Sequence, residues 1–245
     1  MPTISHLSLI LCVSLTLFAA CQSESPSAQP TRPLAKKQAT NTSETIKKIP
    51  ASHAQGPCKA DFDLAIHLLR EAERMSEDSI PYSAAKGNDC SGIFHQFLNT
   101  VKEHCPDAQY PKMSQARDSR AIAQWYHKWG QLQIVEDPDK DSPLIQPGMV
   151  LFYGYGQRKT PYTYGQLTID SLNIRGRGIN HVAVVVSVNR NEEGVLESYD
   201  IFHGRNPRHP AGITTSQRFR ARHPNLPMYG NWKQPWLAAA YLLTP

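Results

Sequence analysis

The sequence predicts an α+β domain across residues 58–245, in which N-terminal helices pack on a central antiparallel β-sheet. Two observations support this class. Apolar residues recur at helical spacing in the first half of the region, and β-branched runs separated by polar turns occupy its second half. A chain of this length can bury a substantial core as one domain.

The first predicted helix covers residues 60–75. Its apolar stripe comprises Phe62, Ala65, Ile66, Leu69 and Ala72. His67 falls outside this stripe, and we expect its side chain to be solvated.

The second predicted helix follows Asp89, a natural N-cap residue. Behind it, apolar residues recur at helical spacing at Ile93, Phe94, Phe97, Leu98 and Val101. This pattern places Cys90 in the first turn of a helix whose inner face is buried. A third helix is predicted at residues 119–130, with one face in the core formed by Ile122, Trp125, Tyr126 and Trp129.

Strand signals follow in the second half. A Pro-Gly turn at residues 147–148 precedes a strand at 149–153, and the β-branched run 181–188 is typical of a central strand. After a polar turn, a further strand passes through Tyr199, Ile201 and His203.

The last two strands are predicted to form an antiparallel hairpin. With residues 189–195 as the loop, Val188 lies opposite Leu196 and His181 lies opposite His203. Directly opposed side chains share one face of a sheet, so this register brings the two histidines together.

The chain begins with a candidate export signal. Residues 7–20 form an apolar run that is too short to span a bilayer comfortably, so we predict a signal peptide at 1–20. The small residues before Cys21 resemble a bacterial lipoprotein site, in which Cys21 becomes lipidated. An ordinary secretory signal with an incidental cysteine is the alternative. Gln22 after the cysteine resembles lipoproteins of the outer membrane.

Residues 21–57 are predicted to be a disordered tether, because this polar segment contains few large apolar residues. The formal net charge of +5 is dispersed, and no Lys/Arg block resembles a nucleic-acid-binding arm. We therefore expect no nucleic-acid partner. A mildly basic surface suits an anionic polymer or a membrane.

The cysteines indicate one disulfide and one free thiol. Of the five, Cys12 and Cys21 belong to the signal and anchor, which leaves Cys58, Cys90 and Cys105. We hypothesise a Cys58–Cys105 bridge, which leaves Cys90 free. Neither a C-x-x-C nor an H-x-x-x-H spacing occurs, so no zinc site and no cofactor are expected.

Cys90, His181 and His203 have the residue types of a thiol nucleophile, its base and the group that orients the base. A helix N-terminus favours thiolate, and such sites lower a cysteine pKa from roughly 8.5 to about 3.5–7.5. His181 would take the Cys90 proton and later deliver a proton to the leaving amine. Backbone N–H groups at the helix start would stabilise the oxyanion.

Four motifs resemble the NlpC-type cell-wall peptidases, which are papain-like cysteine enzymes of bacterial envelopes. They are DCSG at 89–92, PGMVLFY at 147–153, HVAVVVSV at 181–188 and IFHG at 201–204. The resemblance covers roughly residues 58–245 and implies a papain-like fold. It also implies a catalytic triad of Cys90, His181 and His203, with Tyr82 near the oxyanion.

The chain departs from this family in three places. Ser83-Ala84-Ala85 stands where the family has Trp-Gly-Gly, and Met149 replaces its usual Asp. The interval 154–180 is long, and loops of this length commonly have a function. We hypothesise that it walls a substrate groove; an ordinary solvated insertion is the alternative. Substrate binding is assigned to Ser91, Arg175 and Arg177.

The sequence therefore predicts a lipid-anchored enzyme on the periplasmic face of the outer membrane, with peptidoglycan stem peptides as its substrate. The resemblance implies an endopeptidase that acts near D-glutamyl–diaminopimelyl bonds. A CHAP-like amidase is the alternative enzyme, because HVAVVVSV also resembles that family's strand. A non-catalytic wall-binding lipoprotein is the alternative of a different class. The sequence identifies no regulatory protein partner.

Overall fold

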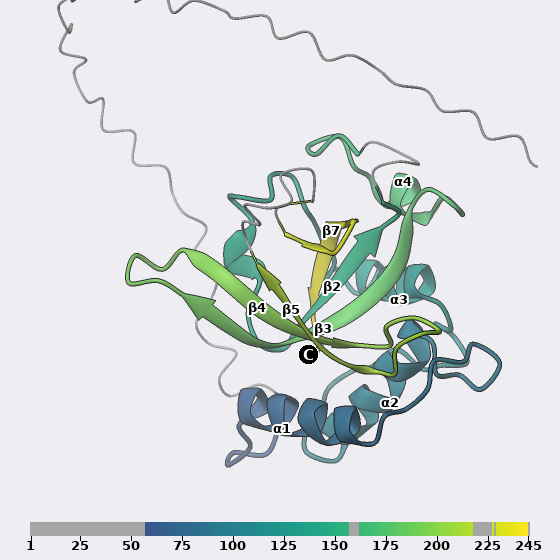
Figure 1. Ribbon diagram of the computed structural model, residues 1–245, viewed down its shortest axis with the longest axis vertical. Coiled ribbons are helices and arrows are strands. Elements are labelled where there is room, and N and C mark those ends of the chain that lie inside the picture. Colours follow the sequence, from purple (N-terminus) through teal and green to yellow (C-terminus); the bar gives the residue numbers. More distant parts are fainter. Residues whose placement is uncertain (1–56, 157–161, 218–226, 228, 245) are drawn as a thin grey trace, which may run out of the picture. The chain divides into compact units, whose positions relative to one another are not determined.

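The computed structural model describes residues 57–156, 162–217, 227 and 229–244 (Figure 1). The predicted signal peptide, Cys21 and all but the last residue of the predicted tether lie outside these residues. None of the helices in these residues combines the length and the apolar character of a membrane-spanning segment.

The domain is organised around a seven-stranded antiparallel sheet with the order β1-β7-β2-β3-β4-β5, to which β6 is joined through β7. The strands are β1 (Gln133–Ile134), β2 (Met149–Gly154), β3 (Ile179–Arg190), β4 (Leu196–His203), β5 (Gly212–Gln217), β6 (Gly230–Asn231) and β7 (Gln234–Tyr241). Mixed helix and antiparallel sheet confirms the predicted α+β class.

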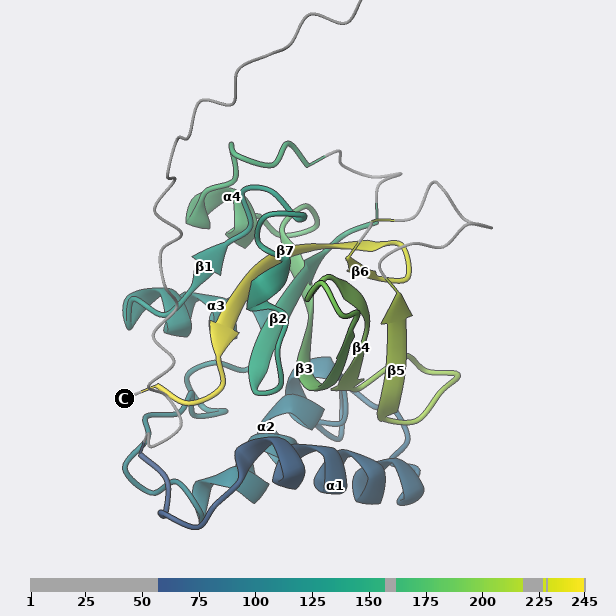
Figure 2. The same ribbon diagram turned by 90° about the vertical axis from the view of Figure 1, so that its left-hand side faces the viewer.

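The helices are α1 (Leu64–Glu77), α2 (Cys90–Lys102), α3 (Ser119–Lys128) and α4 (Ile169–Asn173), with a 3₁₀ turn, η2 (Ser142–Leu144). Asp63, Asp89 and Asp118 cap the first three helices by accepting backbone N–H groups of the first turn. Figure 2 shows α1 and α2 lying together along one side of the strands.

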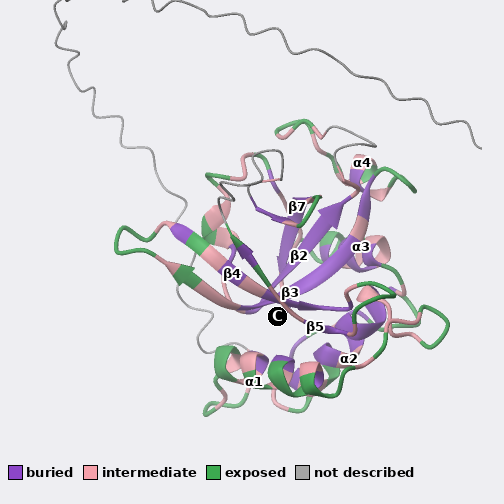
Figure 3. Ribbon diagram, in the orientation of Figure 1, coloured by how far each residue is buried: buried purple, intermediate pink, exposed green. Residues whose placement is uncertain are grey.

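The core forms two layers, one on each face of the sheet. On one face, α1, α2 and α3 pack against β2, β3 and β4, and the Phe97 and Phe202 rings lie 4.8 Å apart between α2 and β4. On the other face, Tyr153, Tyr199 and Trp236 form a second buried cluster. The strands β2, β3, β4 and β7 are therefore buried along most of their length, whereas the outer face of α1 is exposed (Figure 3).

Two helix predictions need correction. Helix α1 begins at Leu64 because Asp63 caps it, so Phe62 precedes the helix. The buried stripe is Leu68, Ala72 and Met75, and Ile66 is 58% exposed. Helix α3 buries Ile122 and Tyr126 as predicted, but it ends before Trp129, which is 46% exposed.

His67 is half-buried, so its side chain is solvated only in part. Its ring lies 5.0 Å from that of Phe62 and 4.9 Å from that of His104, and its Nε2 is 3.4 Å from the Thr100 hydroxyl. Burial, followed by the neighbouring His104, lowers the pKa of His67. This ring cluster lies beside the Cys58–Cys105 disulfide, which is present as predicted, with Cys90 left as a free thiol.

The three predicted strands are present, but the hairpin register differs from the prediction. Val184 pairs with Phe202 and Val188 with Tyr199, with irregularities after Val185 and after Asn189. Strand β3 extends to Arg190, so the turn is shorter than predicted. At the other end of the hairpin the register is shifted by two residues, and His203 lies diagonal to His181. A two-residue shift keeps both histidines on the same face.

The interval 154–180 is partly folded onto the domain. Tyr162 accepts a hydrogen bond from the Tyr155 N–H and donates one to the Arg177 carbonyl, and Tyr164 donates to the Trp236 carbonyl. Leu172 of α4 is buried. The hydroxyls of Tyr162 and Tyr164 therefore hold the interval on the domain, and its role as a groove wall stays a prediction. Residues 157–161 lie outside the described part.

Candidate active site

Cys90 is the first residue of α2, and its position depends on a tightly packed helix tip. The Asp89 carboxylate accepts a hydrogen bond from the Gly92 N–H at 2.9 Å. A Cβ at Gly92 would lie 1.8 Å from the Gly87 carbonyl oxygen, so only glycine fits there. Two residues of the Asp-Cys-Ser-Gly motif thus shape the turn that presents the thiol.

The sulfur of Cys90 lies against the beginning of β3. Its Sγ is 4.0 Å from the carbonyl oxygen of Asn180, the residue before His181, and Cys90 as a whole residue is half-buried. This contact confirms that the helix tip and the histidine strand meet.

The two histidines form a hydrogen-bonded pair. His181 Nε2 lies 2.7 Å from His203 Nδ1, and His203 Nε2 lies 3.0 Å from the Thr214 hydroxyl on β5. Both imidazoles are at least 95% buried. The described residues offer no hydrogen-bond partner to His181 Nδ1, so this nitrogen is left for the thiol or a substrate. No hydrogen bond joins it to Cys90 Sγ within the described part of the chain.

Gly204 brings the end of β4 against the helix tip. A Cβ at this position would lie 2.9 Å from the Asp89 carbonyl atoms and 3.0 Å from the Cys90 nitrogen. A side chain here would force β4 and α2 apart. The glycine after His203 therefore allows the histidine pair to lie near the thiol.

Tyr82 lies within electrostatic range of the thiol. Burial raises the pKa of its hydroxyl, and the neighbouring Cys90 and Asp89 raise it further. The predicted position of Tyr82 beside Cys90 is consistent with these interactions.

Burial makes the neutral forms of the thiol and the imidazoles the stable ones. Burial and the Asp89 charge raise the pKa of Cys90 to about 11, although the N–H groups of Val182, Ser91 and Cys90 oppose the shift. Burial lowers the pKa of His181 to about 4, and burial and His181 hold the pKa of His203 well below its ordinary value. The depressed cysteine pKa predicted from the helix N-terminus is therefore wrong, because burial and the Asp89 charge outweigh the backbone N–H groups around the sulfur.

Ser91 does not face a substrate surface. Its side chain is 98% buried, its hydroxyl donates to Asp89 at 3.0 Å, and it accepts a hydrogen bond from Arg117 at 2.7 Å. The predicted substrate contact of Ser91 is corrected to a supporting role beneath the helix tip. Arg175 and Arg177 are exposed in the loop after α4, and their substrate role stays a prediction.

Two residues of this site were not predicted. Thr214 lies on β5, opposite Ile201, and is brought to His203 only by strand pairing. Arg117 is brought to Asp89 across a loop, and neither residue carries a local sequence signal. No cluster of three or more His, Cys, Asp or Glu side chains that could hold a metal occurs among the described residues.

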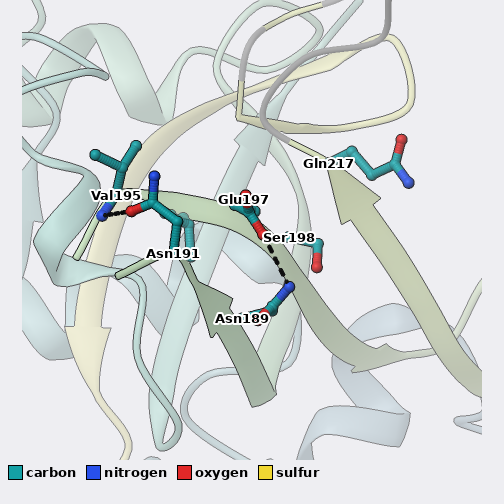
Figure 4. Close-up of a pocket in the computed structure, with 7 residues that line it drawn as sticks. Asn189, Asn191, Val195, Glu197, Ser198 and Gln217 are labelled. Carbon is teal, nitrogen blue, oxygen red and sulfur yellow. Dashed lines mark hydrogen bonds between the residues drawn. The ribbon is translucent and has the colours of Figure 1, made fainter. Parts of the chain in front are cut away.

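No family model, curated protein or solved structure matches this chain. The assignment of a site therefore depends on geometry alone. A pocket of about 390 Å³ lies at the far end of the β3–β4 hairpin, lined by Asn189, Asn191, Val195, Leu196, Glu197, Ser198 and Gln217 (Figure 4).

That pocket is separate from the thiol. Asn189 and His181 lie at opposite ends of β3, roughly 25 Å apart at a rise of about 3.3 Å per residue. Its lining offers amides, a hydroxyl and one carboxylate, without a nucleophile and base in contact. The group formed by Cys90, His181, His203 and Thr214 is therefore the candidate active site.

Proposed function

We propose that this protein is a papain-like thiol hydrolase that cleaves amide bonds in peptidoglycan stem peptides. The observation that carries the proposal is the free Cys90 at a helix tip, in contact with the strand of a buried His181–His203 pair. The four motifs that resemble NlpC-type peptidases support the choice of substrate class.

The tautomer of the histidine pair determines whether His181 can act as a base. If Thr214 accepts from His203 Nε2–H, then His203 Nδ1 accepts from His181 Nε2–H. His181 Nδ1 then carries a free lone pair, as a general base requires. In the opposite tautomer, His181 Nδ1 carries the proton and cannot accept one.

The reaction begins from a neutral thiol and a neutral imidazole. As Cys90 Sγ attacks the scissile carbonyl carbon, its proton passes to His181 Nδ1 and a tetrahedral oxyanion forms. The Cys90 backbone N–H stabilises this oxyanion. Collapse breaks the C–N bond, the amine leaves with the His181 proton, and a thioester remains. His181 then deprotonates a water molecule that hydrolyses the thioester and regenerates the thiol.

The decisive experiment is digestion of defined stem peptides and muropeptides, with the products identified by mass spectrometry. We expect the wild-type protein to cleave an amide bond and the Cys90→Ala variant to be inactive. Full hydrolytic activity of Cys90→Ala would exclude this mechanism. Cleavage within the stem peptide identifies an endopeptidase, and release of the intact peptide from the glycan identifies an amidase.

A non-catalytic wall-binding protein is the second candidate. The raised pKa of Cys90 favours it, because a protonated thiol is a poor nucleophile. It predicts binding to purified cell walls, no hydrolysis, and unchanged binding by Cys90→Ala.

We also propose that Cys21 carries a lipid and that the protein is held on the periplasmic face of the outer membrane. The residues before Cys21 support the lipid by their resemblance to a lipoprotein site, and Gln22 supports the outer membrane by its resemblance to lipoproteins of that membrane. Recovery of a Cys21→Ala variant in the soluble periplasmic fraction, with wild type in the membrane fraction, is the expected result. Equal distribution of the two would reject the anchor.

A further inference from the structure

Arg117 lies behind the helix tip, in the segment before α3. Its guanidinium meets the Asp89 carboxylate at two points, with Nη1 3.0 Å from Oδ1 and Nη2 3.1 Å from Oδ2. Nη1 also donates to the Ser91 hydroxyl at 2.7 Å. A planar two-point contact fixes orientation in a way that a single contact cannot.

The same guanidinium reaches the loop that precedes Cys90. Arg117 Nη2 donates to the Ala84 carbonyl at 3.3 Å, in the loop that also carries Tyr82. The backbone beside Arg117 is fastened to α2, because buried His95 donates from Nε2 to the Ala116 carbonyl at 2.7 Å. Arg117 is thus supported by the helix whose first turn it holds.

The Asp89 carboxylate has two opposing effects on this turn. It caps α2, and its charge raises the pKa of the adjacent Cys90. Burial raises the pKa of Asp89, but hydrogen bonds from Arg117, the Gly92 N–H and Ser91 outweigh it, so the carboxylate stays ionised. The Arg117 cation is the countercharge to this carboxylate.

The other titratable groups at Cys90 are neutral near pH 7. Tyr82 has a raised pKa, and His181 and His203 have lowered values. Asp89, whose charge is the second cause of the raised Cys90 pKa after burial, is therefore the ionised group beside the thiol, and it is paired with Arg117.

We propose that Arg117 is a positioning residue for Cys90, which locks the Asp89 cap in place and neutralises its carboxylate so that the thiolate can form. The inference rests on the proposed function in taking Cys90 as the nucleophile. Its test uses the thiol itself and needs no substrate.

The experiment measures the rate at which iodoacetamide alkylates Cys90 in the full chain between pH 7 and 9, by mass analysis of the peptide that contains Cys90. This range lies below the wild-type midpoint of the pH–rate profile, so the ratio of the rates of two proteins at one pH gives the difference between their midpoints. Alkylation reports the thiolate fraction. We expect Arg117→Ala to move the midpoint of the pH–rate profile of alkylation to higher pH. At pH 8 this variant should be alkylated roughly threefold to tenfold more slowly than the wild type. Asp89→Asn keeps a good N-cap and should move the midpoint to lower pH.

The two substitutions should be coupled. In the Asp89→Asn background, Arg117→Ala should have a much smaller effect than in the wild type, because the charge that Arg117 neutralises is absent. Arg120→Ala is the matched control, since Arg120 pairs with Asp118 in the same segment and should leave the profile unchanged. An unchanged midpoint in Arg117→Ala, or an equal shift in both backgrounds, would overturn the proposal.

Arg117→Lys keeps the test decisive if Arg117→Ala fails to fold. Lysine retains the charge without the two-point contact, so an intermediate shift is expected and a wild-type profile contradicts the positioning role. The outcome also separates this inference from the proposed function. A shifted profile in a protein that hydrolyses no stem peptide supports the positioning role of Arg117 and rejects the hydrolase. An unshifted profile in an active enzyme supports the hydrolase and rejects the positioning role.

Discussion

At the scale of single residues, His203 lies between His181 and Thr214, and the direction of its two hydrogen bonds determines which nitrogen of His181 carries the proton. Thr214 is the outermost member of this chain. A hydroxyl can donate or accept, but only as an acceptor does it leave His181 Nδ1 free as a base. The tautomer of the His181–His203 pair therefore depends on Thr214, a residue on a third strand.

Substitution of Thr214 tests this role. We expect Thr214→Val, which removes the hydroxyl at nearly constant shape, to reduce kcat on a stem peptide roughly 2- to 12-fold, the value of one net hydrogen bond. Thr214→Ser keeps the hydroxyl and should retain most of the activity. Steady-state kinetics checks both variants, and equal rates for valine and serine would show that the hydroxyl has no role.

The buried histidines also make stability dependent on pH. The pKa of His181 is about 4 in the folded chain and near 6.5 when unfolded, so its neutral form stabilises the fold. This contribution is fully present above pH 6.5 and is lost as the pH falls toward 4. We expect His181 to account for a loss on the order of 2 kcal/mol in the free energy of unfolding between pH 7.5 and pH 5.

Urea unfolding at the two pH values measures this loss. A His181→Asn variant serves as the comparison, because it lacks the titrating group and should lose less stability over the same interval. Identical pH dependence of the two proteins would contradict the buried neutral imidazole.

At the scale of elements, the site depends on how closely β4 meets the first turn of α2. Gly204 permits this approach, since a Cβ there would lie 2.9 Å from backbone atoms of Asp89 and 3.0 Å from the Cys90 nitrogen. Backbone atoms cannot move aside as a flexible side chain can. The strand and the helix must therefore separate if this glycine is replaced.

We expect Gly204→Ala to lower the free energy of unfolding by about 1–3 kcal/mol, as overpacking does, and to reduce activity through the displaced histidine pair. Gly194→Asn is the control, because Gly194 lies in the β3–β4 turn with open space around it and a positive φ that asparagine tolerates. Denaturant unfolding and peptide hydrolysis would be compared for both. Wild-type behaviour of Gly204→Ala would mean that the two elements are not closely packed.

At the scale of the whole molecule, the interval 154–180 leaves and rejoins the sheet at the strand ends that lie near Cys90. Strand β2 ends at Gly154 and β3 begins at Ile179, close to Cys90. The hydroxyls of Tyr162 and Tyr164 donate hydrogen bonds that hold the interval on the domain. Arg175 and Arg177 remain exposed beyond α4, where they are available to a carboxylate-rich peptide.

Replacing both arginines by alanine should raise KM for a stem peptide with free carboxylates roughly twofold to tenfold, with little change in kcat, because exposed ion pairs are weak and act before the chemical step. Arg70→Ala, on the exposed side of α1, is the control. Amidation of the peptide carboxylates should remove the difference between the double variant and the wild type. An unchanged KM would show that the two arginines do not bind the peptide.

The sequence alone determined those features that depend on local rules. The Asp89 cap, the apolar spacing behind Cys90 and the β-branched run of β3 predicted their elements, because capping and periodicity are properties of adjacent residues. Counting cysteines predicted the Cys58–Cys105 bridge and the free Cys90. In α1 the predicted stripe shared only Ala72 with the face that is buried, because the choice of face depends on packing against the rest of the domain.

Only the tertiary structure decided how these elements act together. Irregular pairing moved the hairpin register, and strand pairing brought Thr214 to His203. Loop packing brought Arg117 to Asp89, so the carboxylate at the helix tip is paired with an arginine 28 residues away in the chain. Burial reversed the predicted direction of the Cys90 pKa, because desolvation depends on every group packed around the sulfur and a helix terminus supplies only part of that environment.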